Sequence, residues 1–370
     1  MKRLLLLGGG HAHVYVLDAL RKAHPTDVDI TLVSPHVRQV YSGMLPGWIA
    51  GHYPLEACVL PLDRLAARAG VRFIQQAARH IDLAAKQVEC CDGEKIDFDI
   101  LSIDTGPVTD GRIIPGAAEH ALPIRPIERL IRGWEAWLAE LANGNGGSIA
   151  IVGGGAAGVE LAFAMRHRLE RDAPTRNIEI HLVSSREEPL AGMPLILRKR
   201  AMRLLAERGV GFHGGRRAIH YDGHTLCLTG GTRLPARQCL LVPGAAAPVW
   251  PKASGLDTDT SGFIRVGPTL QSTSHPFVFA AGDIAAHAHP RPKSGVFAVR
   301  AGPPLAENLL RALSGEPLQP WKAQRRALYL VSTGERHALA AWGPLAWWGD
   351  WVWRWKDRID RQFIARFTPR

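Results

Sequence analysis

The sequence predicts an α/β fold made of two Rossmann-like domains and a C-terminal tail. Two observations carry this prediction. A unit of strand, glycine-rich turn, helix and strand occupies residues 2–34, and a second copy of the unit occupies residues 148–184. A length of 370 residues suits two or three domains better than a single small core.

The composition is that of an ordinary globular protein. Hydrophobic residues make up 46% of the chain and charged residues 21%. The net charge of +11 permits anionic partners, but the basic residues are scattered, except at residues 198–203 and from Arg354 onward. We therefore expect no nucleic-acid partner.

The five cysteines and the N-terminus add two expectations. No pair of cysteines has CxxC spacing, so the sequence predicts no metal site. The apolar run before Gly8 holds only four leucines, too few for a signal peptide. No stretch of about 18 apolar residues that could span a membrane is present. We therefore expect the protein in the cytoplasm.

The first unit begins with an apolar strand at residues 2–7 and turns at Gly8 and Gly10 into a helix. Glycines suit this turn because a phosphate must approach the backbone closely, at the start of a helix. His13 stands where the fingerprint has its third glycine. His11 and His13 could ligate a metal, but no third ligand lies nearby in sequence, so capping or packing near a phosphate is favoured.

The second unit satisfies the whole fingerprint. Gly153 allows the tight turn, Gly155 the close approach of a pyrophosphate, and Gly158 the contact between helix and strand. Ala156 follows at the start of an amphipathic helix. Because this turn follows a clean strand and opens such a helix, it is far more specific than the motif alone.

A carboxylate normally follows the second strand of each unit and binds the adenosine ribose. Ser34 and Ser184 stand at these two positions instead. Arg186 would accept the 2′-phosphate of NADPH. The alternative is a surface arginine without a ligand, because Glu187 and Glu188 adjoin it. The choice between NADH and NADPH stays open.

The other predicted elements connect the two units. We expect helices at residues 127–141 and 195–207, and an apolar strand that stops at Pro243-Gly244. Another strand, at residues 277–281, stops at Gly282-Asp283. Further strands are expected at residues 71–81, 87–96, 100–104, 217–221 and 225–228.

Motifs in this order resemble the pyridine nucleotide-disulfide oxidoreductase superfamily. They are, along the chain, the first glycine turn, SIDTGP, the second glycine turn, LLVPGAAAP and TLQSTSHPFVFAAGD. The resemblance implies a glutathione-reductase-like fold that binds FAD and NADH or NADPH, with Gly282 and Asp283 at the ribityl chain of the flavin. It also implies an FAD domain at residues 1–125 and 255–325, a nicotinamide domain at 126–254 and a C-terminal element at 326–370.

Within the superfamily, the chain is similar to the FAD oxidoreductases found alone or fused in front of selenide, water dikinase, and to type II NADH:quinone dehydrogenases. GGGHAHV, YSGMLPGWIAGHY, SIDTG and WRWKDRIDRQF carry this resemblance. It implies FAD contacts at Gly8, Gly10, His11, His13, Ser34, Tyr41, Gly43, Met44, Thr105, Gly106, Gly282, Asp283 and Val296. It implies nucleotide contacts at Gly153, Gly155, Ala156, Gly158, Ser184, Arg186 and Gly244.

The resemblance also bears on where the electrons go. Disulfide reductases carry a CxxxxC pair above the flavin, where this chain has residues 41–46 without a cysteine. A quinone, another small oxidant or oxygen would then take the electrons directly. By resemblance to GxGxxGxE sequences, Glu160 would face the nicotinamide, although the helix dipole alone also favours a glutamate there. Lys293 opens a helix that points at the flavin in relatives, where it adds positive charge or is simply solvated.

The C-terminal segment is rich in tryptophan and arginine. Residues 345–367 look like one helix whose tryptophans and basic residues suit the interface of an anionic bilayer, at the inner face of the cell membrane. The alternatives are a cap that packs on the protein body and a contact in a homodimer.

Three functional hypotheses follow. The first is an NAD(P)H dehydrogenase that uses FAD and reduces a quinone or another small acceptor, without a redox-active disulfide. The second is an oxidoreductase of selenium or sulfur metabolism linked to selenophosphate synthesis. The third is a non-enzymatic protein that senses FAD or NAD(P)H and binds partners through its C-terminal tail.

Overall fold

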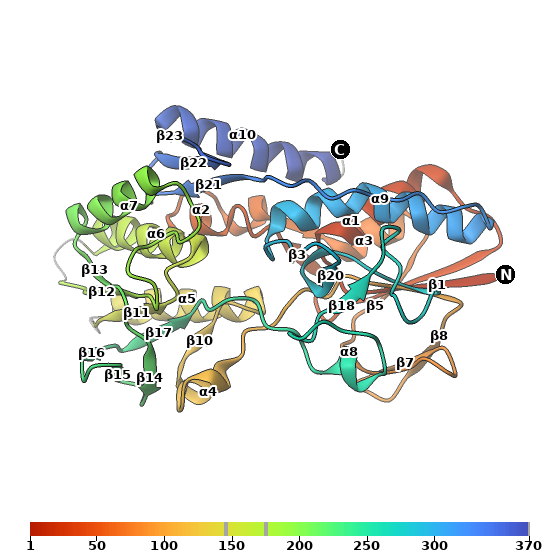
Figure 1. Cartoon of the computed structure of the whole chain (residues 1–370), viewed down its shortest axis with the longest axis horizontal. Coiled ribbons are helices and arrows are strands. Elements are labelled where there is room, and N and C mark those ends of the chain that lie inside the picture. The colour runs from red at the N-terminus through yellow and green to blue at the C-terminus, as the bar shows by residue number, and fades with distance from the viewer. Residues whose placement is uncertain (144–146, 174–176, 369–370) are drawn as a thin grey trace.

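The computed structural model describes residues 1–143, 147–173 and 177–368, in which two parallel β-sheets stand side by side (Figure 1). The first sheet has the order β19-β9-β1-β2-β5, and all its pairings are parallel. Its strands are β1 (Lys2–Leu7), β2 (Val28–Val33), β5 (Arg72–Ile74), β9 (Ile100–Ile103) and β19 (Val278–Ala280). The four leucines of β1 are at most 2% exposed, as a strand covered on both faces requires.

The second sheet repeats this design with the order β10-β17-β11-β12-β13, again all parallel. Its strands are β10 (Leu122–Pro123), β11 (Ile149–Val152), β12 (Ile180–Val183), β13 (Val210–His213) and β17 (Gln238–Leu241). Helices α5 (Ile127–Ala142), α6 (Ala156–Asp172) and α7 (Leu195–Glu207) accompany it. The predicted fold of two Rossmann-like units is confirmed.

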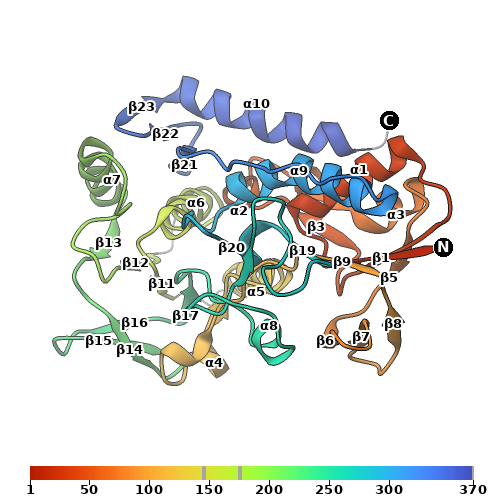
Figure 2. The same ribbon diagram turned by 45° about the vertical axis from the view of Figure 1, so that its right-hand side comes forward.

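Helices α1 (His11–Ala23) and α9 (Gly295–Ser314) lie side by side near the first sheet (Figures 1 and 2). Gly302 of α9 permits this close approach, since a Cβ there would overlap the ring of Tyr15 on α1. The two helices begin almost 300 residues apart in the chain. They nevertheless pack in the same layer beside the first sheet.

Short elements fill the connections. Antiparallel pairs and triplets are formed by β3 (Arg38–Val40) with β4 (Val59–Pro61), by β6 (Ala78–Asp82), β7 (Gln87–Cys90) and β8 (Lys95–Asp97), and by β14 (Ala218–Tyr221), β15 (Thr225–Leu228) and β16 (Arg233–Pro235). The strands β18 (Ile264–Val266) and β20 (Ala285–His287) pair in parallel. The short helices are α2 (Leu45–Ile49), α3 (Leu62–Arg68), α4 (Ala117–His120) and α8 (Trp250–Ala253).

The C-terminal unit is a three-stranded antiparallel sheet followed by helix α10 (Asp350–Phe367), which runs along one side of the molecule (Figure 2). The strands are β21 (Leu328–Ser332), β22 (Ala338–Trp342) and β23 (Leu345–Gly349). The prediction of one helix over residues 345–367 is therefore wrong for its first part. Gly349 has φ +132°, a backbone conformation that side-chain-bearing residues rarely adopt, and it separates strand from helix.

Helix α10 packs on both units. Phe363 and Phe367 join the core of the first unit, while Trp353 packs against the core of the second. In the described residues, no helix is both long and apolar enough to cross a membrane.

The division into an FAD domain, a nicotinamide domain and a C-terminal element remains a prediction. The packing places the start of the second unit differently from this division. Strand β10 falls within residues 1–125, yet it pairs with β17 in the second sheet. Ile114 and Ala117, just before β10, also pack in a core cluster with residues of that sheet. By its packing, the second unit therefore begins before residue 126.

Candidate functional site

Three glycines from the two ends of the first unit converge on one acid, Asp104. A Cβ on Gly8, which has φ +95°, would stand 2.5 Å from the Asp104 carbonyl oxygen. A Cβ on Gly10 would overlap the Asp104 carboxylate, and one on Gly282 would stand 2.6 Å from its Oδ1. The glycine turn at the N-terminus and the late Gly-Asp strand end therefore meet, as the sequence prediction requires.

Asp104 caps helix α1. Its Oδ2 accepts hydrogen bonds from the backbone N–H groups of Ala12 at 2.7 Å and His13 at 2.9 Å. The side chain is 2% exposed, and burial raises its pKa to about 7, with the charge of Asp283 acting in the same direction. Sequence reasoning quoted Asp104 within SIDTGP but missed its role. An acid at the end of a fully buried strand, opposite a glycine turn, was the available signal.

His13 fastens the glycine turn rather than pointing at a ligand. Its Nδ1 lies 2.6 Å from the carbonyl oxygen of Gly8, and its Nε2 lies 2.8 Å from Ser102 Oγ on β9. Burial lowers its pKa to about 4, so the ring is neutral. Both ring nitrogens have partners inside the protein, which differs from the expectation that His13 contacts the cofactor.

His11 and Ser294, at the starts of α1 and α9, present polar atoms without partners. His11 Nε2 and Ser294 Oγ are buried and have no hydrogen-bond partner in the described part of the chain. Burial and the positive charge of Arg125 lower the pKa of His11 to about 4. Burial raises the pKa of Asp283, whereas Arg125, which lies 3.7 Å away, and the backbone N–H of Ser294 oppose the increase. These four residues therefore form one continuous site that links the two helix N-termini.

The site fits FAD. A buried polar atom without a partner costs free energy, so His11 Nε2 and Ser294 Oγ call for a ligand with hydrogen-bonding groups. Arg125 supplies positive charge beside Asp283, and helices α1 and α9 both begin at this site, where their first backbone N–H groups favour a phosphate. Sequence reasoning missed Arg125, because an arginine between prolines carries no recognisable pattern.

For the other residues expected at the FAD, the structure gives the burial and the partners but no link to the site around Asp283. Ser34 is buried and donates its hydroxyl to the His36 carbonyl at 3.1 Å. Met44 is buried in the core, whereas Thr105 is exposed and Gly106, with φ +73°, faces open space. Val296 is half-buried in the first turn of α9. Their contacts with the cofactor remain predictions.

Lys293 has partners of its own. Its ammonium donates to the Ala285 carbonyl at 2.6 Å and lies 3.9 Å from the centroid of the Phe263 ring. Burial lowers its pKa, although the charges of Asp283 and Asp259 oppose that change. Lys293 is half-buried and lines the cavity beside Asp283, and its contribution of positive charge at the flavin remains a prediction.

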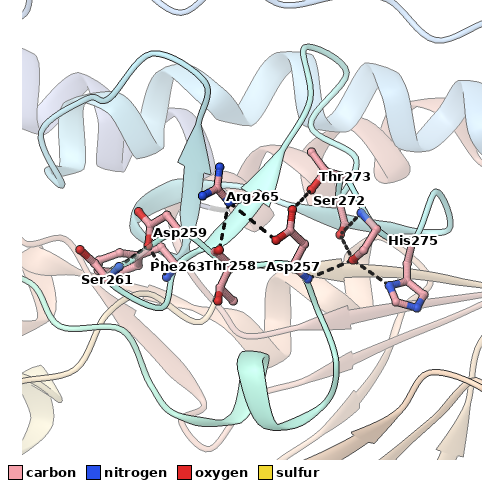
Figure 3. A network of polar contacts seen from close by, with 10 residues as sticks. Asp257, Thr258, Asp259, Ser261, Phe263, Arg265, Ser272, Thr273 and His275 are labelled. Atoms are coloured by element: carbon pink, nitrogen blue, oxygen red, sulfur yellow. Dashed lines mark hydrogen bonds and ion pairs between the residues drawn. The ribbon is translucent and has the colours of Figure 1, made fainter.

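A cavity of about 350 Å³ adjoins Asp283 on the side of β18 and β20. Its wall is held by the polar network in Figure 3, in which Asp257 binds Arg265 and accepts from Thr273 Oγ1 at 2.8 Å. Asp259 accepts two backbone N–H groups at 2.9 Å. Asp257 and Asp259 use their carboxylates to hold this wall together. We therefore assign them a structural role next to Asp283.

The second glycine turn leaves one position open. A Cβ on Gly153 would overlap the Val242 carbonyl oxygen, and one on Gly158 would overlap that of Gly153. A Cβ on Gly155, directly before Ala156 at the start of α6, would meet nothing within 4 Å. Gly244 likewise faces open space. Gly153 and Gly158 are thus required by the fold itself, whereas Gly155 is not.

A buried ionic cluster lies where α10 covers residues 41–44. Lys356 donates to the Gly43 carbonyl at 2.5 Å and to Asp360 Oδ2 at 2.7 Å, and both charged residues are buried. Burial lowers the pKa of Lys356, but the charges of Asp360 and Glu160 outweigh it and raise the value. Lys356 therefore belongs to the interior and, among the basic residues of the C-terminal segment, is not available to a bilayer surface.

Glu160 of α6 completes this cluster. Its Oε1 accepts the backbone N–H of Ser332 at 2.8 Å. Burial raises its pKa to about 7, while Lys356 pulls it down. Sequence reasoning selected Glu160 but missed Lys356 and Asp360 as its neighbours.

Tyr41 joins the cluster to the first site. Its ring stacks on that of Phe363, with the ring centroids 4.3 Å apart, and its centroid lies 5.6 Å from that of the His11 ring. Burial, followed by the negative charge of Asp360, raises the pKa of Tyr41. In the described residues, no group of three or more His, Cys, Asp or Glu side chains could hold a metal ion.

Comparison with known proteins identifies the family. The model of the family "Pyridine nucleotide-disulphide oxidoreductase" matches residues 2–302. The type II NADH:quinone oxidoreductase of Staphylococcus aureus (strain NCTC 8325 / PS 47) is 26% identical over 349 residues, which cover 87% of this chain and 85% of that protein.

Two solved structures share the fold. NDH2 from Plasmodium falciparum, in complex with NADH, has a TM-score of 0.84 at 13% identity, covering 98% of this chain and 97% of that one. The sulfide:quinone oxidoreductase from Aquifex aeolicus has a TM-score of 0.81 at 19% identity, covering 99% and 91%. The predicted resemblances to the superfamily and to type II NADH dehydrogenases are confirmed.

Proposed function

The chain belongs to the pyridine nucleotide-disulphide oxidoreductase family, and from this premise we propose that it is an FAD-dependent NADH dehydrogenase that reduces a quinone. The observation that supports this most is the buried cluster of Glu160, Lys356 and Asp360 under α10. It stands beside residues 41–46, where disulfide reductases carry their cysteine pair. An acid and base group thus takes the place of the thiols.

The cofactor is held by the residues around Asp283. His11, Arg125 and the N-terminus of α9 would bind FAD, and Gly8, Gly10 and Gly282 make room for Asp104 at the start of α1. When bound, FAD supplies hydride and electron transfer between the nicotinamide and the acceptor. The turn at Gly155 would bind the pyrophosphate of the nucleotide at the start of α6.

The cluster supplies protons for the acceptor. Reduction of a quinone to a quinol consumes two protons, and a general acid works best when its pKa lies near the operating pH. The Glu160 carboxyl, with a pKa of about 7, is partly protonated in neutral solution, and Lys356, whose charge acts on this carboxyl, holds a further proton. We assign Glu160 to protonation of the acceptor and Lys356 to setting its pKa.

The cysteines suit this proposal. All five are free thiols, and Cys58 is the one whose pKa responds to Asp360 of the cluster. Burial, followed by the charge of Asp360, raises its pKa to about 12. Because only the thiolate reacts readily, Cys58 is unsuited to dithiol chemistry with the cofactor.

The proposed activity is tested by adding NADH anaerobically to the purified yellow protein and following the flavin absorbance. We expect bleaching with the nucleotide and recovery of the colour on addition of a soluble quinone analogue. Flavin that stays oxidised with both NADH and NADPH would point to the non-enzymatic sensor. Bleaching without recovery would exclude the quinone.

Asp104 makes FAD binding depend on pH. Its carboxyl is neutral below its pKa of about 7 and negative above it, where it repels a bound phosphate. We expect the dissociation constant of FAD to be about tenfold higher at pH 8.5 than at pH 6.5. The measurement is equilibrium titration of the apoprotein. The variant Asp104→Asn should lose this dependence, and a wild-type protein as insensitive to pH as the variant contradicts the expectation.

We also propose that the C-terminal unit contacts a membrane surface. Four large apolar side chains of this unit are exposed: Trp342 (44%), Leu345 (47%), Trp351 (48%) and Trp355 (36%). Trp351 and Trp355 stack with parallel rings 6.3 Å apart, and Arg354 and Arg358 on the same helix are exposed. Tryptophans with adjacent cations are typical of the interface of an anionic bilayer.

The double variant Trp351→Ser/Trp355→Ser tests this contact. We expect its binding to vesicles of anionic phospholipid to fall about tenfold, because each indole that enters the bilayer interface removes apolar area from water. The control is Ile113→Ser/Ile219→Ser, which changes two side chains that are 56% and 49% exposed outside the C-terminal unit. Equal binding of both variants in co-sedimentation would exclude the contact.

A further inference from the structure

The cavity beside Asp283 lies next to the proposed flavin site but is lined by other residues. Its volume is about 350 Å³, and its walls come from β18, β20, the first turns of α9 and the segment before that helix. His11, Arg125 and Ser294, which form the proposed flavin site together with Asp283, do not line it. Cavities of this size hold small-molecule ligands. A second ligand can therefore be accommodated on this side of Asp283.

Arg291 brings a guanidinium to this cavity on a constrained loop. A proline precedes it and another follows, and proline restricts both its own backbone and that of the residue before it. The Arg291 Nη1 group donates to the Pro290 carbonyl at 3.3 Å, while Nε is buried without a partner in the described part of the chain. Because an unpaired buried donor costs free energy, this guanidinium favours a ligand that accepts hydrogen bonds.

Lys293 adds a second cation to the same wall. Its ammonium lies 3.9 Å from the centroid of the Phe263 ring and donates to the Ala285 carbonyl at 2.6 Å. An ammonium carries three N–H groups, so two remain for a ligand. Among the ion pairs of the described residues, none involves Lys293 or Arg291.

The acids of this region are engaged by other groups. Asp257 pairs with Arg265, the third cation of the lining, at 3.7 Å. Asp259 accepts two backbone N–H groups at 2.9 Å through one carboxylate oxygen. Asp283 has its partner in Arg125, which lies 3.7 Å away and outside the lining. The two other cations are therefore left without a bound carboxylate in the part of the chain that the structure describes.

His287 of β20 shows the effect of this charge. Its ring lines the cavity and lies edge-on to Trp321, with the ring centroids 5.6 Å apart. Burial lowers the pKa of His287 to about 4, and the positive charges of Lys293 and Arg291 act in the same direction. The two cations thus make this part of the cavity positive, which favours an anionic ligand.

We propose that this cavity binds a small organic anion, with a phosphate or carboxylate head group held by Arg291 and Lys293. Guanidinium and ammonium groups bind both head groups through charge-assisted hydrogen bonds. Val266, Phe297 and Ala301 supply apolar wall for the body of the ligand. The site does not depend on which nucleotide or electron acceptor the protein uses.

The test is calorimetric titration of the FAD-loaded full chain with phenyl phosphate and with benzoate at constant ionic strength. We expect saturable binding, and the probe that binds more tightly identifies the head group. Arg291→Gln should weaken that binding by about 10- to 100-fold, the equivalent of one or two charged hydrogen bonds. Arg64→Gln removes an exposed arginine from α3 and should leave the affinity unchanged.

Tryptophan fluorescence gives a second readout, because Trp321 packs against His287 at the cavity. The bound anion should change the emission of the wild type, and Trp321→Phe should lose this change while it keeps the calorimetric affinity. Failure of both probes to bind, or equal affinities of the wild type and Arg291→Gln, would overturn the inference. So would binding to the apoprotein that FAD abolishes, because the cavity would then belong to the flavin site. None of these results bears on reduction of the flavin by NADH.

Discussion

Replacement of Gly155 by alanine will remove most use of the nicotinamide nucleotide without unfolding the protein. Gly155 has φ −75° and ψ −177°, which alanine adopts readily, and an added Cβ would meet no protein atom within 4 Å. The methyl group would instead stand where a pyrophosphate must approach the start of α6. We expect kcat/KM for the nucleotide to fall about 100-fold, as for a loss of close approach worth roughly 3 kcal/mol.

Two other glycines separate this effect from a general loss of stability. Gly158→Ala should destabilise the fold by about 1–3 kcal/mol, because its methyl group overlaps the Gly153 carbonyl. Gly267→Ala places a methyl group 3.9 Å from the nearest protein atom, away from the turn, and should change neither the melting temperature nor the kinetics. A Gly155→Ala protein with a wild-type KM would show that the nucleotide binds elsewhere.

The sequence predicted those parts of the fold that local chemistry determines. The helix at residues 195–207 was predicted with the bounds that the structure shows, because its spacing of apolar residues and its flanking proline are local signals. Gly153 and Gly158 were recognised for the same reason, since each must avoid a backbone atom within a few residues or on an adjacent strand.

The site residues that were missed depend on contacts distant in sequence. Asp104 binds N–H groups about 90 positions earlier in the chain, and Arg125 faces an acid more than 150 positions later. The identity of an isolated aspartate or arginine says nothing about which helix end it will meet. Only the pairing of β19 with β9 brings Asp283 to this place.

In the C-terminal helix, charged residues lie on the buried face, which the sequence alone did not indicate. Val352, Lys356, Asp360, Phe363 and Phe367 are buried on one face at helical spacing. Sequence reasoning treated all basic residues of this segment alike, as groups that suit a bilayer interface, although a paired lysine can be buried. Here Asp360 follows at i+4 and neutralises the lysine, so the two side chains are buried together as an ion pair.

The acid–base cluster under that helix leads to the last prediction. Glu160→Gln should lower the rate of quinone reduction at pH 6.5 by about 100-fold, the usual contribution of a general acid. The wild-type rate should fall as the pH rises through about 7, because the carboxyl then loses the proton it donates. The variant, which has no titrating carboxyl at this position, should lose that decline. The measurement is steady-state quinone reduction between pH 5.5 and 9.

Lys356 determines where the decline occurs. Its positive charge lowers the pKa of Glu160, so Lys356→Met should raise that pKa and move the decline to higher pH. Because this change leaves Asp360 buried without a cation, the double variant Lys356→Met/Asp360→Asn keeps the interior neutral. Glu307→Gln, in an exposed ion pair on α9, serves as the control and should show the wild-type profile. A Glu160→Gln protein that keeps the wild-type midpoint would remove Glu160 from proton transfer and leave Lys356 as the remaining donor of the cluster.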